Sequence, residues 1–285
     1  MKSLVKYIFS ILIISFCISE VLLRLLGGVG KPFEAVVKDG FFYNKINTDG
    51  LSVYGTFPVL IKKKYKINNE GYNSSKDYLE IDDYSKMIGL VGDSFIEGYH
   101  VDVENSIGRL IEEKCDSIFV EEYGIGGHNI HNYIESYNNN NMHLYKKVYF
   151  FIHITDFLKD VSYKSKYNRF KEKYFRPLYE ASFLLQFINK NHKPFAREKK
   201  MNKQISKFTK SKVLRFLEQS KNVSFIYRDA NVSDELDFIK EQIEIVDHRI
   251  KPFDYGFDQH WNDNGRQNIA IHILNNLGLI RCQNF

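Results

Sequence analysis

The feature of this 285-residue chain that most restricts its fold is an alternation of short apolar runs with stretches of helical spacing after residue 86. Short runs that are apolar at every position are typical of strands buried on both faces, and strands separated by helices lie parallel in one sheet. The apolar runs lie at residues 87–91, 118–120, 148–152 and 223–227, and helical spacing is present at 107–115 and 269–279. The sequence therefore predicts an α/β fold with a doubly wound, flavodoxin-like parallel sheet flanked by helices over residues 86–285.

The first 28 residues predict a membrane anchor. Lys2 and Lys6 precede an uncharged run at 7–19, and apolar residues resume after Glu20. A cationic flank before an apolar run is an export signal, and the missing small-residue cleavage site favours a retained transmembrane helix. Because the cationic end stays in the cytoplasm, we expect a membrane-anchored, extracytoplasmic protein. A cleaved signal peptide or a buried amphipathic helix is the alternative, since the run is short and Glu20 interrupts it.

Two further parts are expected between the anchor and the C-terminus. Residues 29–85 form a connector with short strands at 59–61 and 65–67 and a turn at 69–73. A basic insertion at about 159–215 interrupts the α/β domain, with 17 Lys or Arg against 4 Asp or Glu in a chain of net charge +5. Its apolar residues around Phe183 and Phe187 have helical spacing, which predicts a helix on the protein body or on the bilayer. The charge is either a solvated helical face or a surface for anionic lipid or glycan, and export disfavours nucleic acid.

The cysteines leave one question open. Cys17 lies in the apolar segment, so Cys115 and Cys282 are the pair that an oxidising compartment could join. Their spacing gives no support for a disulfide.

A serine and a histidine stand where the predicted sheet would place reactive groups. Ser94 follows Gly92-Asp93 at the end of the first apolar run, and parallel sheets present functional side chains at this end. A serine hydroxyl needs a base to become a nucleophile. His260 precedes the last helix and could reach the same edge, and Asp258 could fix its tautomer. Each motif alone is also an ordinary turn or surface sequence.

Taken together, these segments resemble the SGNH/GDSL hydrolase family. Residues 92–95, Gly-Asp-Ser-Phe, are similar to the first block, which carries the nucleophilic serine, and residues 123–127, Tyr-Gly-Ile-Gly-Gly, to the second. Residues 258–262, Asp-Gln-His-Trp-Asn, are similar to the last block, which supplies acid and base. The Asn-x-x-Gly-aromatic pattern at 68–72 and the Glu-x-x-x-Arg pattern at 20–24 resemble membrane-tethered members of the family.

This resemblance implies roles for particular residues. Ser94 would be the nucleophile, His260 the base and Asp258 the acid, and the backbone N–H groups of Ser94 and Gly127 would hold the oxyanion. Thr155 stands where the family has an Asn that completes the oxyanion hole, and a hydroxyl donates over a shorter reach than an amide. Asp258 lies two residues before His260, whereas the family often places its Asp three residues before the His. No cofactor and no metal are implied.

The expected function is a serine ester hydrolase or O-acyltransferase that acts through an acyl-enzyme. Its expected substrates are acyl or acetyl esters on a small molecule or on envelope or exported polysaccharide, which an exported anchored protein can reach. The alternative is a non-catalytic glycan- or partner-binding protein with a degenerate site, motivated by Thr155 and by the basic insertion. A metal hydrolase using Asp258 and His260 has no second ligand cluster in the sequence to support it.

Overall fold

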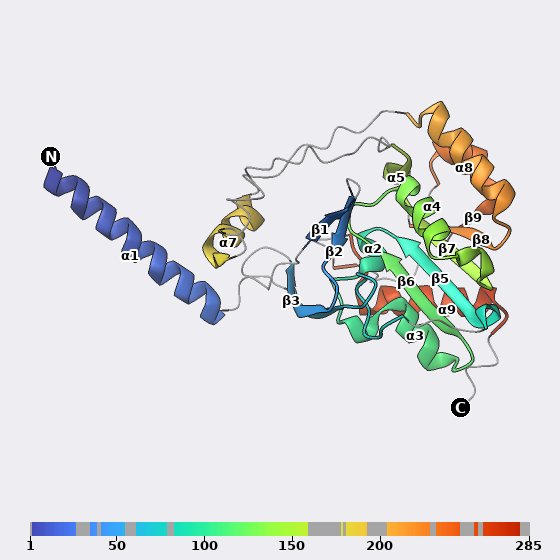
Figure 1. Cartoon of the computed structure of the whole chain (residues 1–285), viewed down its shortest axis with the longest axis horizontal. Helices are drawn as coiled ribbons and strands as arrows, with labels where there is room; N and C mark the ends of the chain where they lie inside the picture. Colours follow the sequence, from blue (N-terminus) through green and yellow to red (C-terminus); the bar gives the residue numbers. More distant parts are fainter. Residues whose placement is uncertain are drawn as a thin grey trace.

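A five-stranded parallel sheet forms the centre of the structure, with strand order β6-β5-β7-β8-β9 (Figure 1). The computed structural model describes residues 2–26, 35–38, 41–54, 61–78, 83–158, 178, 181–192, 204–228, 232–245, 254–255 and 259–279. The strands are β5 (Met87–Gly92), β6 (Phe119–Gly124), β7 (Lys147–Ile152), β8 (Val223–Tyr227) and β9 (Ile243–Ile245). The first strand of the sheet lies between the second and the third, which is the doubly wound, flavodoxin-like order. The predicted fold class is therefore confirmed.

Helices cover both faces of this sheet (Figure 1). The α-helices are α1 (Lys2–Leu26), α2 (Ser94–Glu97), α3 (Ile107–Lys114), α4 (Ile130–Asn139), α5 (Ile154–Leu158), α7 (Phe183–His192), α8 (Lys207–Gln219) and α9 (Asp263–Asn276). Short 3₁₀ helices are η1 (Tyr84–Lys86), η2 (Val103–Asn105), η3 (Met142–Leu144) and η5 (Asp234–Gln242). Helices α3 and α9 pack on one face of the sheet, and α4 and α8 pack on the other.

Strand β7 shows why the apolar runs are continuous. Tyr149 and Phe151 are buried on the face that α3 and α9 cover, whereas Phe150 and Ile152 are buried on the face that α4 and α8 cover. Successive side chains of a strand point to opposite faces, so a strand with helices on both sides needs an apolar residue at every position. The two hydrophobic cores of the domain therefore meet at this strand.

Two antiparallel hairpins precede the sheet. Strands β1 (Ala35–Lys38) and β2 (Phe41–Asn44) form one pair, and β3 (Thr48–Tyr54) and β4 (Ile61–Ile67) form the other. The expected strand at 65–67 is the end of β4, and the expected turn follows it at 69–72. Of the expected strand at 59–61, residues 59 and 60 lie outside the described residues.

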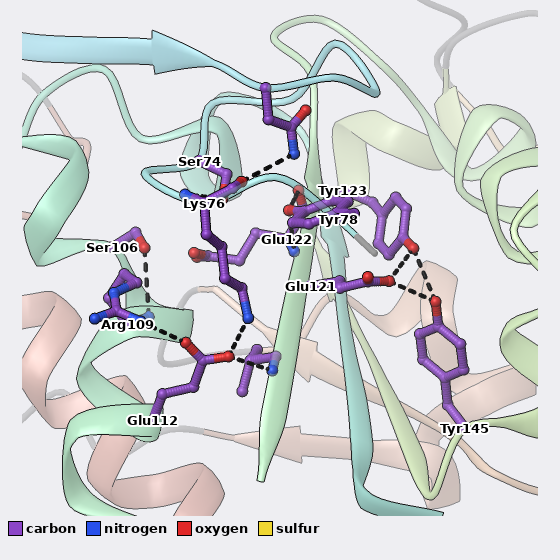
Figure 2. Close-up of polar contacts among 12 residues, drawn as sticks. Ser74, Lys76, Tyr78, Ser106, Arg109, Glu112, Glu121, Glu122, Tyr123 and Tyr145 are labelled. Atoms are coloured by element: carbon purple, nitrogen blue, oxygen red, sulfur yellow. Dashed lines mark hydrogen bonds and ion pairs between the residues drawn. The ribbon is translucent and has the colours of Figure 1, made fainter. Parts of the chain in front are cut away.

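The chain that follows β4 covers the outer edge of the sheet, which β6 forms (Figure 2). The Tyr78 hydroxyl accepts a hydrogen bond from the Glu122 N–H (2.7 Å) and donates one to the Glu122 carbonyl (2.9 Å). Beside it, the Lys76 ammonium group pairs with Glu112 of α3, and the same carboxylate accepts the Val120 N–H (2.7 Å). An uncovered strand edge would offer its backbone groups to another chain, so this segment blocks such pairing.

Strand β6 extends further than its apolar run because its two acidic residues are buried with partners (Figure 2). Glu121 accepts hydrogen bonds from the hydroxyl groups of Tyr123 (2.5 Å) and Tyr145 (2.6 Å). Glu122 is buried on the opposite face, near the guanidinium group of Arg266. The predicted strand at 118–120 therefore continues to Gly124 as β6.

Helix α1 is long and apolar enough to cross a bilayer, and its apolar side chains are not buried against the rest of the described protein (Figure 1). A retained anchor and a signal sequence both have these properties. The helix satisfies the sequence expectation of an apolar N-terminal segment.

The acidic residue that interrupts the apolar segment has partners from the insertion. The Glu20 carboxylate accepts hydrogen bonds from the N–H groups of Phe183 (2.8 Å) and Leu184 (2.9 Å) and from the Ser182 hydroxyl (3.0 Å). Arg24, one turn along α1, also donates to it (2.8 Å). Glu20 thus caps the first turn of α7, and the helix expected around Phe183 is present. Residues 159–177, 179–180 and 193–203 of the insertion lie outside the described residues, as does Cys282.

Gly124, the last residue of β6, allows α2 to pack directly on the sheet. A methyl group at this position would lie 2.1 Å from the backbone nitrogen of Glu97, which is part of α2. Gly124→Ala should therefore force α2 away from the sheet and lower the free energy of unfolding by about 1–3 kcal/mol or more. Gly89→Ala in β5 is the matched control, because its methyl group would meet only side chains, those of Val148 at 3.3 Å and Tyr145 at 3.4 Å. Denaturant unfolding of both variants checks this, and equal stability losses would contradict it.

Candidate active site

Ser94 lies at the turn between β5 and α2, at the carboxyl edge of the sheet. The Asp93 carboxylate accepts the Phe95 N–H (3.0 Å) and so caps α2. Gly92 keeps the turn tight, since a methyl group there would lie 2.6 Å from Cγ1 of Ile96. Strands β6 and β7 flank β5, so Ser94 occupies the point where the strand order reverses, the usual ligand site of such sheets.

The structure brings His260 to Ser94 across 166 residues of sequence. The Ser94 Oγ and the His260 Nε2 are 2.7 Å apart. The imidazole ring of His260 stacks on Phe95, with ring centroids 4.5 Å apart, and on His100, with ring centroids 3.9 Å apart. Two nearly parallel rings at these distances must lie on opposite faces of the imidazole. When Nε2 accepts a hydrogen bond from the Ser94 hydroxyl, the ring is neutral and Nδ1 carries its hydrogen.

Packing and hydrogen bonds on both sides of His260 hold its loop in place. Trp261 packs edge-on against Phe95, with ring centroids 5.0 Å apart, and forms an isolated bridge with Asp254. The Asn262 side chain caps α9 by accepting the Gly265 N–H (2.9 Å) and donates to the Asp254 carbonyl (2.8 Å). Asp258, the expected acid, lies outside the described residues, as does Phe257.

The turn after β6 passes beside Ser94. Gly127 has a φ of +85°, a left-handed conformation that glycine adopts without strain, and Gly126 and Gly127 are both exposed. A methyl group on Gly126 would lie 3.7 Å from the Ser94 Cβ. In the part of the chain that the structure describes, no hydrogen bond uses the Gly127 N–H. The turn that passes Ser94 therefore carries a backbone donor, and the oxyanion role of Gly127 stays a prediction.

Thr155, the third expected oxyanion donor, has a partner in its own loop. Its hydroxyl lies 2.8 Å from the Nδ1 of His153, the residue that follows β7. The backbone N–H of His153 in turn donates to the buried Asp156 carboxylate (2.9 Å). A threonine hydroxyl has one hydrogen, so a hydrogen given to His153 cannot also be given to an oxyanion. The role of Thr155 in an oxyanion hole stays a prediction, and His153 is a nearby polar residue that the sequence reasoning missed.

Arg228 is a second residue that the sequence reasoning missed. It follows β8 directly, and its guanidinium group lies 3.9 Å above the Phe95 ring. Its Nη1 is also 3.9 Å from the Asp93 carboxylate. A basic residue directly after the apolar run at 223–227 is the signal that could have found it, because all parallel strands end at the same edge.

Glu97 connects α2, which begins at Ser94, to the turn after β6. Its buried carboxyl group accepts the Gly126 N–H (2.8 Å) and the Asn44 side-chain amide (3.1 Å). Burial, with a smaller contribution from the neighbouring Asp93, raises the pKa of Glu97 to about 7. Both hydrogen bonds favour the charged form, but they do not offset the effect of burial. Glu97 therefore changes charge near neutral pH beside the Gly126–Gly127 turn.

Comparison with known proteins gives similarity at the level of the fold. No protein-family model matches the chain, and no curated protein matches it. Solved structures that it resembles include a member of the lipolytic G-D-S-L family from Veillonella parvula DSM 2008, with 13% identity, a TM-score of 0.38 and coverage of 66% of this chain and 96% of that chain. A putative lipolytic G-D-S-L protein from Desulfitobacterium hafniense DCB-2 has 12% identity, a TM-score of 0.38 and coverage of 66% and 98%. LAE5, an alpha/beta hydrolase from the metagenome of Lake Arreo, Spain, has 13% identity, a TM-score of 0.34 and coverage of 70% and 97%. The strand order and the position of Ser94 after β5 show a doubly wound, flavodoxin-like fold independently of these alignments.

The raised pKa of Glu97 predicts a pH dependence of stability. The ordinary pKa of this carboxyl is 4.5 and its value in the folded protein is about 7. Between these values the folded protein binds more protons than the unfolded chain, so the free energy of unfolding falls as the pH rises. This fall amounts to up to about 3 kcal/mol between pH 4.5 and 8, and Glu97→Gln should remove it. If the glutamine side chain of this variant loses a hydrogen bond, the cost is the same at low and at high pH. It therefore cancels when the free energies of unfolding at the two pH values are subtracted.

The measurement is denaturant unfolding at pH 5 and pH 8, followed by the fluorescence of Trp261, which is the single tryptophan of the chain. Glu113→Gln, at an exposed position of α3, is the control and should keep the wild-type pH dependence. An unchanged pH dependence in Glu97→Gln would show that Glu97 is already charged at pH 5.

Proposed function

We propose that this protein is a serine ester hydrolase or O-acyltransferase that works through an acyl-enzyme. The observation that supports this most is the 2.7 Å distance between the Ser94 Oγ and the His260 Nε2. A serine hydroxyl becomes nucleophilic when a base within hydrogen-bond reach takes its proton. Both side chains are partly exposed at the carboxyl edge of the sheet, where a substrate can reach them.

In the first half of the reaction, the Ser94 Oγ attacks the ester carbonyl carbon while His260 Nε2 takes the hydroxyl proton. The carbonyl oxygen becomes an oxyanion, which the N–H groups of Ser94 and Gly127 would stabilise. His260 then returns the proton to the leaving alcohol oxygen, and the acyl group stays on Ser94. In this proposal Asp258 would hold the Nδ1–H of His260 and stabilise the imidazolium.

In the second half, His260 takes a proton from water or from a sugar hydroxyl as its oxygen attacks the acyl carbon, and His260 then returns the proton to the Ser94 Oγ as the acyl–serine bond breaks. Attack by water makes the protein an esterase, and attack by a sugar hydroxyl makes it an O-acyltransferase. Both routes use the same base and the same oxyanion donors.

The N-terminal helix supports a location and a substrate class for this chemistry. We propose that α1 stays in the membrane, that the α/β domain lies on the extracytoplasmic side, and that the substrates are acetyl or other acyl esters of envelope or exported polysaccharide. The cationic residues before the apolar run favour this orientation.

A second candidate function is non-catalytic binding of a glycan or a partner. The observation in its favour is the contact between Thr155 and His153, which uses the one hydroxyl that stands where the related enzymes have an amide donor. On this hypothesis Ser94 and His260 would persist as structural residues, and the protein would show no hydrolysis that depends on Ser94.

The catalytic proposal predicts covalent labelling of Ser94. A fluorophosphonate probe should label the full-length protein in detergent micelles at Ser94, and Ser94→Ala should abolish labelling. His260→Ala should lower the turnover of an aryl acetate by about 10⁴-fold or more, because it removes the base. His143→Ala, an exposed histidine outside the site, should keep wild-type turnover. Peptide mass spectrometry locates the label, and labelling that persists in Ser94→Ala would rule out this nucleophile.

The location proposal predicts that the full chain stays in the membrane pellet after alkaline carbonate extraction. A C-terminal alkaline phosphatase fusion should be active, because that enzyme folds only after export, and deletion of residues 2–26 should make it inactive by keeping it in the cytoplasm. An inactive full-length fusion, or a protein that carbonate releases, would contradict the proposal.

A further inference from the structure

A cleft of about 570 Å³ opens beside His128, the residue that follows the Gly126–Gly127 turn. One wall is formed by the end of β2, with Tyr43 and Asn44, by the residues that follow it, and by the turn after β4. The opposite wall is one face of α4, including Glu135 and Asn139. The volume is within the range of about 300–1,000 Å³ that is typical of small-molecule sites.

The pattern of α4 places polar groups in this cleft. Its apolar residues Ile130, Tyr133, Ile134 and Tyr137 are buried in the core under the sheet. The cleft is lined instead by Asn132, Glu135, Ser136 and Asn139, which recur at helical spacing on another face of the helix. The polar stripe therefore faces a concave surface rather than open solvent.

Contacts connect the cleft to the catalytic turn. Asn44 lines the cleft and donates to the Glu97 carboxyl, which itself accepts the Gly126 N–H. His128, another lining residue, directly follows Gly127 and meets the Tyr43 ring edge to face, with centroids 6.0 Å apart. A ligand in the cleft would therefore touch the residue next to the expected oxyanion donor.

The lining chemistry fits an uncharged, hydroxyl-rich ligand. The polar groups of the lining are mainly amides, hydroxyls and carboxylates, which together both donate and accept hydrogen bonds as vicinal sugar hydroxyls require. Lys45 is the single basic residue of the described lining, against two acidic residues, Glu70 and Glu135, so an anionic ligand would meet net repulsion. The rings of Tyr43 and Tyr72 supply apolar surface for the C–H face of a sugar.

Two lining side chains have hydrogen-bonding capacity to spare. Glu135 and Asn139 lie four residues apart on α4, and among the described residues neither side chain makes a hydrogen bond or an ion pair. They lie one above the other on the helix surface, so one ligand can contact both.

We propose that this cleft binds an uncharged saccharide unit of the acylated glycan and thereby presents its ester to Ser94. The presentation of an ester rests on the proposed function, whereas saccharide binding does not. Glu135 and Asn139 hydrogen-bond the sugar hydroxyls, and Tyr43 packs against the ring.

The test measures glycan binding apart from catalysis. Full-length Ser94→Ala protein in detergent micelles is titrated calorimetrically with partially O-acetylated cello-oligosaccharides. The same titration uses acetylated oligogalacturonides as the anionic counterpart. In this background Asn139→Ala and Glu135→Gln should each raise the Kd for the neutral oligosaccharide about tenfold, through loss of a hydrogen bond. Asn138→Ala is the matched control, because Asn138 is an exposed neighbour on α4 that does not line the cleft, and its Kd should equal that of the parent.

The outcomes separate this inference from the proposed function. Absence of saturable binding, equal affinities for the Asn139 and Asn138 variants, or preference for the anionic oligosaccharide would each overturn the cleft assignment. If Ser94-dependent aryl acetate hydrolysis is found together with one of these results, the catalytic proposal stands without it. If hydrolysis is absent but binding depends on Asn139 and Glu135, the catalytic proposal fails and the cleft assignment stands.

Discussion

The candidate active site depends on one buried hydrogen bond, from the Arg266 guanidinium group to the Phe95 carbonyl (2.6 Å). Arg266 belongs to α9, which begins shortly after His260, and Phe95 follows Ser94, so this bond joins the two distant parts of the chain that must meet. Burial lowers the pKa of Arg266, and the buried carboxyl of Glu122 opposes that shift. Gly98 makes the bond possible, because a methyl group there would lie 2.5 Å from Nη2 of Arg266. Replacing Arg266 or Glu122 should therefore be costly, because the other residue of this buried pair would be left with an uncompensated charge.

The sequence predicted those strands whose burial is uniform. The runs at 148–152 and 223–227 became β7 and β8 because both faces of each strand are covered. Only the start of β6 could be predicted, since Glu121 and Glu122 are buried through tyrosine hydroxyls and a distant guanidinium that no local pattern reveals. Strand β9 escaped for a similar reason, because it has three residues and Glu244 at its centre.

The Ser94 and His260 pair could be found from the sequence because each residue lies in a short motif, and the 2.7 Å distance between Ser94 Oγ and His260 Nε2 agrees with the expected pairing. The residues around this pair could not be found in that way. His153 and Arg228 reach the same edge because β7 and β8 end there, and Glu97 acquires its raised pKa only because folding buries its carboxyl group. These properties arise from segments that are far apart in the chain and meet only in the folded sheet.

The stacking of His260 between Phe95 and His100 restricts how its ring can move. A ring held between two nearly parallel rings can turn within its own plane, but it cannot tilt without displacing a neighbour, and the Phe95 neighbour is itself held by Trp261 and Arg228. The two neighbouring rings therefore fix the plane of the imidazole. If Ser94 and His260 act as proposed, His260 would exchange protons only with atoms that lie close to this plane.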